Sequence, residues 1–216
     1  MNIDFARQQM IQQQIRAWDV LDDDVLDVFE TVHRELFVPA GFADLAFAET
    51  EIPIGHGESM LTPVIEGRTL QALALSPADA VLEIGTGTGF LTACLARLAE
   101  TVVSIDIHED FVDRARRNLD AASIGNANLQ LMDGTRELPA GSFDAVVVGG
   151  SIERFDPRYV HALNPGGRLF VVVGSAPTME ARLVTRSTEA DWKSEVLFET
   201  VLKPLENGTL PPEFLF

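Results

Sequence analysis

One stretch decides the fold of this 216-residue chain: Val81-Leu82-Glu83-Ile84-Gly85-Thr86-Gly87-Thr88-Gly89-Phe90. It begins with the apolar residues of a buried strand, and three glycines then stand on alternate positions. The residues that follow, 91–98, have the apolar spacing of a helix. Because glycine has no Cβ, it lets a backbone turn sharply and lets a ligand approach closely. A strand, a glycine-rich turn and a helix in this order are typical of α/β folds that bind nucleotides.

The spacing of the glycines distinguishes between classes of ligand. A dinucleotide-binding turn has the form G-x-G-x-x-G, which would require a glycine where Phe90 stands. The form found here is E-x-G-x-G-x-G, with Glu83 before the first glycine. It resembles motif I of the class I S-adenosylmethionine (SAM) methyltransferases. This resemblance implies that the turn binds SAM and the product S-adenosylhomocysteine.

Acidic residues follow the next predicted strands. The strand 101–105 ends at Asp106, about 20 residues after Gly85, where an α/β nucleotide fold places its ribose-binding carboxylate. The strand 129–132 ends at Asp133-Gly134, which in the methyltransferases lies beside the adenine amino group. Taken singly, the second pair could be a surface turn and Asp106 could lie near a helix start. Taken together, these features predict a cofactor site made of Glu83, Gly85, Thr86, Gly87, Gly89, Asp106, Ile107, Asp133 and Gly134.

The composition limits the partners of the chain. Its 33 acidic and 16 basic residues give a formal charge of −17, which argues against nucleic acids and anionic membranes as partners. No apolar stretch is long enough to span a membrane. Cys94 is the single cysteine, so no disulfide can form within the chain and a cytoplasmic location is expected. No metal site is expected, because the histidines are scattered along the sequence at positions 33, 56, 108 and 161.

The pattern along the chain predicts two regions. Residues 1–77 are expected to form a helical, substrate-side region packed on the core, and residues 78–216 a SAM-binding Rossmann-like domain with C-terminal strands. Helices are predicted over 4–17, about 25–32 and 64–75, and residues 40–60 are expected to be irregular. The second region is predicted to alternate strands at 81–84, 101–105, 129–132, 143–148, 168–173, 181–188 and 194–202 with helices at 90–98, 109–122 and 157–163. This alternation predicts an α/β fold with a doubly wound, mostly parallel, seven-stranded sheet.

Motifs outside the glycine turn resemble those of one methyltransferase family. Nearly the whole chain is similar to the protein-L-isoaspartate O-methyltransferases. The similarity rests on Met10-Ile11, His33-Arg34-Glu35-Leu36-Phe37-Val38-Pro39, Ile52-Pro53-Ile54-Gly55-His56-Gly57, Asn164-Pro165-Gly166-Gly167-Arg168-Leu169 and Lys203-Pro204-Leu205. The resemblance implies a class I methyltransferase fold with an N-terminal helical addition. It also implies methyl transfer from SAM to the α-carboxyl group of isoaspartyl residues in damaged proteins or peptides.

One stretch departs from the family pattern. After G-x-G the family has Q-T-I-S-x-P, with the serine beside the reacting carboxylate, where this chain has Glu58-Ser59-Met60-Leu61-Thr62-Pro63. Leucine cannot hydrogen-bond a carboxylate, and Glu58 brings a negative charge that is unfavourable there unless it is paired or protonated. Either the loop has drifted, with Ser59 or Thr62 supplying the hydroxyl group, or the acceptor has changed. We expect Ser59 and Glu58 to act in catalysis, and His56, Leu61 and Thr62 to contact the substrate.

Three functions remain open on the sequence alone. The first is a carboxyl methyltransferase, which needs no general base because a carboxylate is already nucleophilic at neutral pH. The second is an enzyme of the same fold that methylates another small molecule or peptide, for which Glu58 is a candidate base. The third is a SAM-binding module without turnover. The sequence does not give the oligomeric state.

Overall fold

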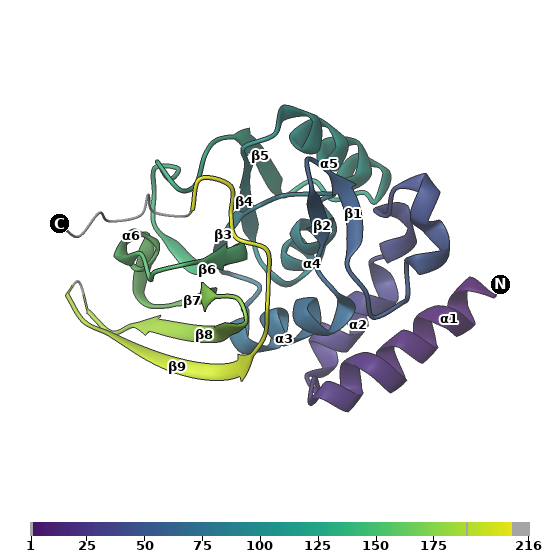
Figure 1. Ribbon diagram of the computed structural model, residues 1–216, viewed down its shortest axis with the longest axis horizontal. Helices are drawn as coiled ribbons and strands as arrows, with labels where there is room; N and C mark the ends of the chain where they lie inside the picture. The colour runs from purple at the N-terminus through teal and green to yellow at the C-terminus, as the bar shows by residue number, and fades with distance from the viewer. Residues whose placement is uncertain (1, 189, 209–216) are drawn as a thin grey trace.

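A central sheet organises the molecule. The computed structural model describes residues 2–188 and 190–208. Seven strands pair in the order β5-β4-β3-β6-β7-β8-β9, and the first five of these run parallel, whereas β8 is antiparallel to both of its neighbours. The predicted doubly wound, mostly parallel sheet is therefore confirmed (Figure 1). The strands are β3 (Ala80–Ile84), β4 (Thr101–Asp106), β5 (Ala127–Leu131), β6 (Phe143–Ile152), β7 (Leu163–Ser175), β8 (Thr178–Arg186) and β9 (Trp192–Glu199).

Helices cover the two faces of this sheet. Successive side chains of a strand point to opposite faces, so Val81 belongs to one buried cluster and Leu82 to another. The first cluster includes residues of α4 and α5, and the second includes Tyr159 and Val160 of α6. Apolar faces on both sides are what parallel strands with helical connections require. The helices of the core are α3 (Pro63–Leu73), α4 (Phe90–Leu98), α5 (Glu109–Ala121) and α6 (Pro157–His161).

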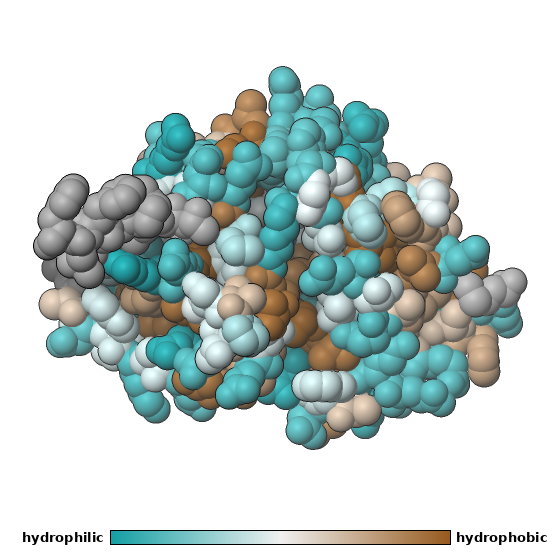
Figure 2. Space-filling model, viewed as in Figure 1, coloured by the Kyte–Doolittle hydropathy of each residue, from teal (hydrophilic) through white to brown (hydrophobic). Residues whose placement is uncertain are grey.

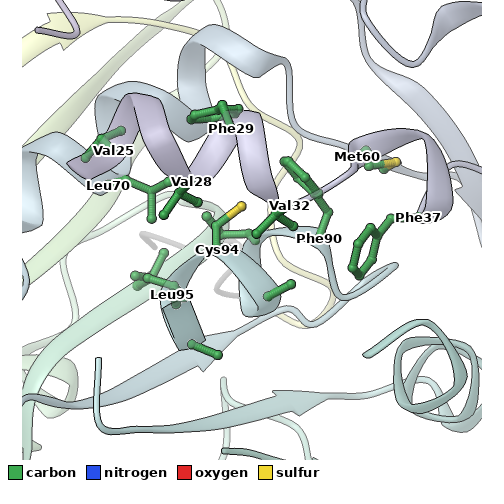
Figure 3. Close-up of a cluster of buried hydrophobic side chains, with 14 of the residues drawn as sticks. Val25, Val28, Phe29, Val32, Phe37, Met60, Leu70, Phe90, Cys94 and Leu95 are labelled. Atoms are coloured by element: carbon green, nitrogen blue, oxygen red, sulfur yellow. The ribbon is translucent and has the colours of Figure 1, made fainter. Parts of the chain in front are cut away.

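The N-terminal region packs its helices on α4. Helix α2 (Asp23–Thr31) begins where the Asp22 carboxylate accepts hydrogen bonds from two backbone N–H groups, as the acidic run at this point predicts. The apolar face of α2 lies against Phe90, Cys94 and Leu95 (Figure 3). Helix α1 (Ile3–Met10) continues as a π-helical turn over Ile11–Ile15 and a 3₁₀ turn over Arg16–Trp18. One buried cluster therefore includes side chains from both predicted regions.

The segment that was expected to be irregular contains regular structure, so this prediction is wrong. Within residues 40–60, Ala40–Leu45 forms a 3₁₀ helix, and β1 (Ile52–Gly55) pairs antiparallel with β2 (Glu58–Met60) as a hairpin. A 3₁₀ turn over Arg34–Leu36 precedes this segment. The turn between these strands has positive φ angles at Gly55 (115°), His56 (52°) and Gly57 (73°). The strands are four and three residues long, and Pro53 interrupts the first, so they are too short to show a clear period.

The chain after β9 returns across the carboxyl ends of the parallel strands (yellow in Figure 1). Ser151, near the end of β6, donates its N–H to the carbonyl of Lys203 at 2.9 Å and accepts the N–H of Leu205 at 2.9 Å. The Ser151 hydroxyl donates to the carbonyl of Leu202 at 2.9 Å. These bonds fix residues 202–205, which we call the C-terminal segment, against the sheet.

The surface drawn in Figure 2 is mostly hydrophilic, with apolar residues exposed near its middle. Within the described ranges, no helix is both long and apolar enough to cross a membrane.

Candidate cofactor and acceptor site

The glycine loop lies at the carboxyl end of β3, where the strand order reverses. Gly85, Gly87 and Gly89 have φ angles of 96°, 55° and 84°, a region that residues with a Cβ rarely adopt. A Cβ on Gly89 would lie 3.0 Å from the Cβ of Ala115 in α5, and one on Gly87 would lie 3.3 Å from Ile54 Cδ1 in β1. The loop is therefore tightly enclosed, and glycine is the residue that fits its backbone.

A cavity opens beside this loop, at the switch point between β3 and β6. Ligands of open α/β sheets bind at this position. Of the predicted cofactor residues, Gly85, Gly87, Asp106, Ile107, Asp133 and Gly134 line the cavity. The acceptor-side residues Glu58, Ser59 and Leu61 line it as well. The structure therefore brings most of the predicted site residues to one place, and their individual roles stay predictions.

Asp106 is fixed by backbone donors at the end of β4. One carboxylate oxygen accepts the N–H of Gly87 at 2.9 Å, and the other accepts the N–H of His108 at 3.0 Å. Each oxygen has a second lone pair, so the group can still accept two hydroxyl groups, as a ribose would require. The side chain is 6% exposed, and burial raises its pKa above the ordinary value, while the two N–H donors oppose this rise.

Asp133 is engaged with its own loop. Its Oδ1 accepts the N–H and the hydroxyl of Thr135 at 3.0 and 2.6 Å, and its Oδ2 accepts the amide of Asn207 at 3.0 Å. Although partial burial raises the pKa of Asp133, these hydrogen bonds and the nearby Arg136 outweigh it and hold the pKa below its usual value. Gly134, the next residue, could not carry a Cβ without meeting Ile84 Cγ2 at 2.6 Å. The backbone at this point therefore packs directly against the end of β3.

Three predicted cofactor residues do not line the cavity. Glu83 is fully buried in β3, and its Oε2 accepts hydrogen bonds from the hydroxyls of Thr92 and Ser104. The Ser104 hydroxyl also lies 2.6 Å from the hydroxyl of Thr86. Gly89 caps the start of α4. The hydrogen bonds of Glu83 and Thr86 hold the glycine loop against β4 and α4. The predicted contact of all three residues with the cofactor remains a prediction.

Glu83 makes stability depend on pH. Burial raises its pKa from 4.5 to about 8, against the hydrogen bonds from Ser104 and Thr92. Between these values the folded chain binds a proton that the unfolded chain releases, so the free energy of unfolding falls as pH rises from about 4.5 to 8. The slope from one proton is at most about 1.4 kcal/mol per pH unit. Urea unfolding of Glu83→Gln is expected to show a flatter pH profile than the unaltered chain, and Glu137→Gln on the surface serves as control. Identical profiles for all three proteins would contradict the assignment.

Glu58 is paired in the wall of the cavity. Lys203 Nζ forms an ion pair with Glu58 Oε1 and donates to the carbonyl of Gly57 at 2.8 Å. The charge that the sequence introduces at position 58 is therefore compensated by a cation from the C-terminal segment. The Lys203 side chain is 47% exposed, and its ammonium group has three N–H donors. A positive group with spare donor capacity thus stands beside the acceptor side of the cavity.

The rest of the acceptor wall is held from the N-terminal region. The backbone carbonyl of Leu61 accepts a hydrogen bond from Arg34 Nη2 at 2.8 Å. Arg34 is 1% exposed, forms a buried ion pair with Glu66 and lies 4.7 Å from the ring centre of Phe90. Thr62 caps the start of α3 and does not line the cavity.

His56 lies outside the cavity, over the first turn of α5. Its ring stacks on that of His108 at 3.9 Å between centres, and its Nε2 lies 3.0 Å from Asp110 Oδ1. Two of the four histidines are therefore adjacent in space although they are far apart in the sequence, so their separation along the chain does not exclude a cluster. The β1–β2 turn brings them together across 52 positions of sequence.

Sequence analysis missed several residues that line the cavity. Gly149 and Gly150 stand in β6, and a Cβ on Gly149 would lie 3.0 Å from the carbonyl of Ile84. Paired glycines inside a strand indicate a close backbone approach, so the signal was present. Ile54 and Lys203 also line it, and they stand in the family motifs but were given no role from the sequence. Lining residues that carried no such signal include Glu51, His108, Phe111, Met132 and Glu206.

The sheet order, the glycine loop after β3 and the acid at the end of β4 define a Rossmann-like class I methyltransferase fold. A sequence model described as protein-L-isoaspartate(D-aspartate) O-methyltransferase (PCMT) matches residues 5–209. The chain belongs to this family.

Curated relatives and a solved structure agree with this placement. The chain is 37% identical over 202 residues to protein-L-isoaspartate O-methyltransferase 1 of Rhodopseudomonas palustris, covering 92% of this chain and 82% of that one. It is 34% identical over 206 residues to protein-L-isoaspartate O-methyltransferase 2 of Pelobacter propionicus, covering 94% and 92%. A Plasmodium falciparum structure, described as a protein of this kind in complex with S-adenosyl-L-homocysteine, superposes with a TM-score of 0.81 at 20% identity, covering 93% and 98%. This structural similarity supports the assignment of the fold.

Proposed function

We propose that the chain is a SAM-dependent carboxyl O-methyltransferase that acts on isoaspartyl residues of damaged proteins or peptides. The observation that carries this proposal is the Glu58–Lys203 ion pair, which gives the acceptor wall a cation where the family's serine is replaced by Leu61. Family membership and the names of the relatives support the same activity. Protein repair in the cytoplasm is part of the proposal, and a single buried cysteine is compatible with a reducing compartment.

The residues of the cavity fit SAM. Gly85 and Gly87 let a ligand approach the backbone, and the Asp106 carboxylate keeps acceptor capacity for ribose hydroxyls. When bound, SAM supplies an electrophilic methyl group on a sulfonium sulfur. The acceptor carboxylate would take up this methyl group, so that an O–CH₃ bond would form as the S–CH₃ bond breaks and the electron pair would remain on sulfur. No proton moves in this step.

The chain contributes position and charge to this reaction. Because no general base is needed, catalysis depends on holding the acceptor in line and on excluding water. Lys203 can donate one hydrogen bond to the acceptor carboxylate while it keeps Glu58 paired. Ser59, which also lines the cavity, can supply a hydroxyl donor. The pairing of Glu58 disfavours its use as a general base, and this weakens the case for an amine or alcohol acceptor.

The direct test is methyl transfer to an isoaspartyl peptide. The full chain is incubated with methyl-labelled SAM and either the isoaspartyl peptide or the same peptide with a normal aspartyl residue. The proposal expects label in a base-labile ester with the first peptide and not with the second. Cofactor binding without any label transfer would instead favour a non-catalytic module. Base-stable label on an unrelated acceptor would favour a changed substrate.

A further inference from the structure

A groove adjoins the cofactor cavity at the C-terminal segment, and we call it the side groove. Its walls come from the chain before β1, the end of β6, the β7–β8 turn and the chain after β9. Four of its residues also line the cofactor cavity, namely Glu51, Leu202, Lys203 and Pro204. The groove is therefore continuous with the place where the acceptor carboxylate is proposed to bind. The return of the chain after β9, which forms this shared wall, is yellow in Figure 1.

Backbone contacts hold the walls of the side groove in place. Thr200 donates its N–H to the carbonyl of Met179 in β8 at 3.1 Å, and the hydrogen bonds of Ser151 fix the C-terminal segment that follows. At the β7–β8 turn, Gly174 has a φ of 131°, and a Cβ there would lie 2.5 Å from the carbonyl oxygen of Thr178. Glycine is thus the residue that lets this turn close tightly. The groove is formed by the fold itself, before any ligand binds.

The lining of the side groove combines an apolar base with two free carboxylates. Met179 and Leu202 are buried, whereas Val201 exposes 51% of its surface. Glu51 and Glu153 are exposed, and neither side chain forms an ion pair or a hydrogen bond within the described part of the chain.

The lining also contains one cation, Lys203, whose charge is already paired with Glu58. Arg154, the residue after Glu153, does not line the groove. The groove therefore has a net negative charge above an apolar base. An unbranched cationic side chain has the matching form, because lysine and arginine place a long apolar stem on such surfaces and keep the charged end in water.

We propose that the side groove binds a lysine or arginine side chain of the polypeptide substrate, one or two residues from its isoaspartyl residue. The inference rests on the proposed function, because it takes the acceptor carboxylate to lie beside the Lys203 ammonium group. Lys203 lines both the groove and the cavity, so a substrate that uses both crosses its side chain. One or two residues of extended chain span about 3–7 Å, which is comparable to the reach of a lysine side chain. The substrate cation then lies near Glu51 and Glu153, with its stem on the apolar base.

The test measures kcat/KM for isoaspartyl peptides that carry lysine, norleucine or glutamate at one of the two positions before or the two positions after the isoaspartyl residue. Norleucine has the unbranched stem of lysine without its charge. At one or more of these positions kcat/KM should fall in the order lysine, norleucine, glutamate. Lysine should exceed norleucine by about two- to tenfold, since partly exposed ion pairs are weak. The formal charge of −17 attracts any basic peptide, so the same exchange is also made far from the isoaspartyl residue, where it should matter less.

Two matched variants locate the effect on the protein. Glu153 lines the side groove and not the cofactor cavity, so Glu153→Gln should at least halve the ratio of kcat/KM between the lysine and norleucine peptides. The control Glu100→Gln removes an equal charge from an exposed residue just before β4, at the opposite edge of the sheet, and should leave this ratio unchanged. Because the readout is a ratio for each protein, a general change in activity cancels.

The outcomes separate this inference from the proposed function. If isoaspartyl peptides are methylated without the lysine preference, or if Glu153→Gln and Glu100→Gln keep the same ratio, the groove does not select the neighbouring side chain and the proposed function stands. If no isoaspartyl peptide of the series is methylated, the proposed function is wrong, and the inference falls with it.

Discussion

Asp106→Ala is expected to weaken the binding of S-adenosylhomocysteine by about 10²- to 10⁴-fold. The carboxylate is positioned by the N–H groups of Gly87 and His108 and keeps a lone pair on each oxygen for a ribose hydroxyl. A hydrogen bond to a charged group contributes about 1.5–3 kcal/mol, and a factor of ten corresponds to about 1.4 kcal/mol. Calorimetry of the variant beside Asp113→Ala, which removes an exposed aspartate of α5, measures the loss.

A second ligand separates lost ribose contacts from a disturbed loop. Removing the 2′-hydroxyl from S-adenosylhomocysteine should weaken binding to the unaltered chain and should change binding to Asp106→Ala far less. A thermodynamic cycle over the two proteins and two ligands gives the coupling between carboxylate and hydroxyl. If the deoxy ligand loses the same affinity with both proteins, Asp106 does not bind that hydroxyl group.

Lys203→Met is expected to lower kcat/KM for an isoaspartyl peptide by about ten- to a hundred-fold or more. The substitution removes one charged donor, which contributes about 1.5–3 kcal/mol, and it leaves Glu58 unpaired in the wall of the cavity. Both effects disfavour an anionic acceptor. Stability should change little, because a partly exposed ion pair contributes about 0–1 kcal/mol.

Glu58→Gln tests the two effects separately. In the double variant Glu58→Gln, Lys203→Met the repulsion is gone but the donor is still missing, so activity should recover in part. Glu58→Gln alone should be at least as active as the unaltered chain, because it frees the ammonium group for the acceptor. If Lys203→Met keeps full activity, then Ser59 or another group must supply the donor, and Lys203 has no role in binding the acceptor.

The sequence predicted the parts of the site that lie close together along the chain. A strand, three alternate glycines and a helix are a local pattern, and Asp106 follows at a spacing that the α/β unit imposes. The positions of Gly85 and Asp106 in the cavity therefore agree with expectation. The resemblance placed Glu58, Ser59 and Leu61 on the acceptor side, and all three line the cavity.

Contacts between distant segments were not predictable in this way. Lys203 meets Glu58 across 145 positions, and the contact depends on how the chain returns after β9. No period or composition signal encodes that path. The same holds for His56 and His108, which meet only because the β1–β2 turn reaches α5. The tight hydrogen bonds of Glu83 to Ser104 and Thr92 likewise depend on the pairing of β3 with β4.

The contacts of Arg34 limit how substrate specificity could be exchanged between members of this family. The guanidinium of this buried residue supports the Leu61 carbonyl from the N-terminal region, while Lys203 supports Glu58 from the opposite end of the chain. A hairpin grafted from a relative would arrive without the partners that shape its backbone and neutralise its charge. A working chimaera must therefore exchange the hairpin together with both of its supports, so that three segments far apart in the gene are inherited as one unit.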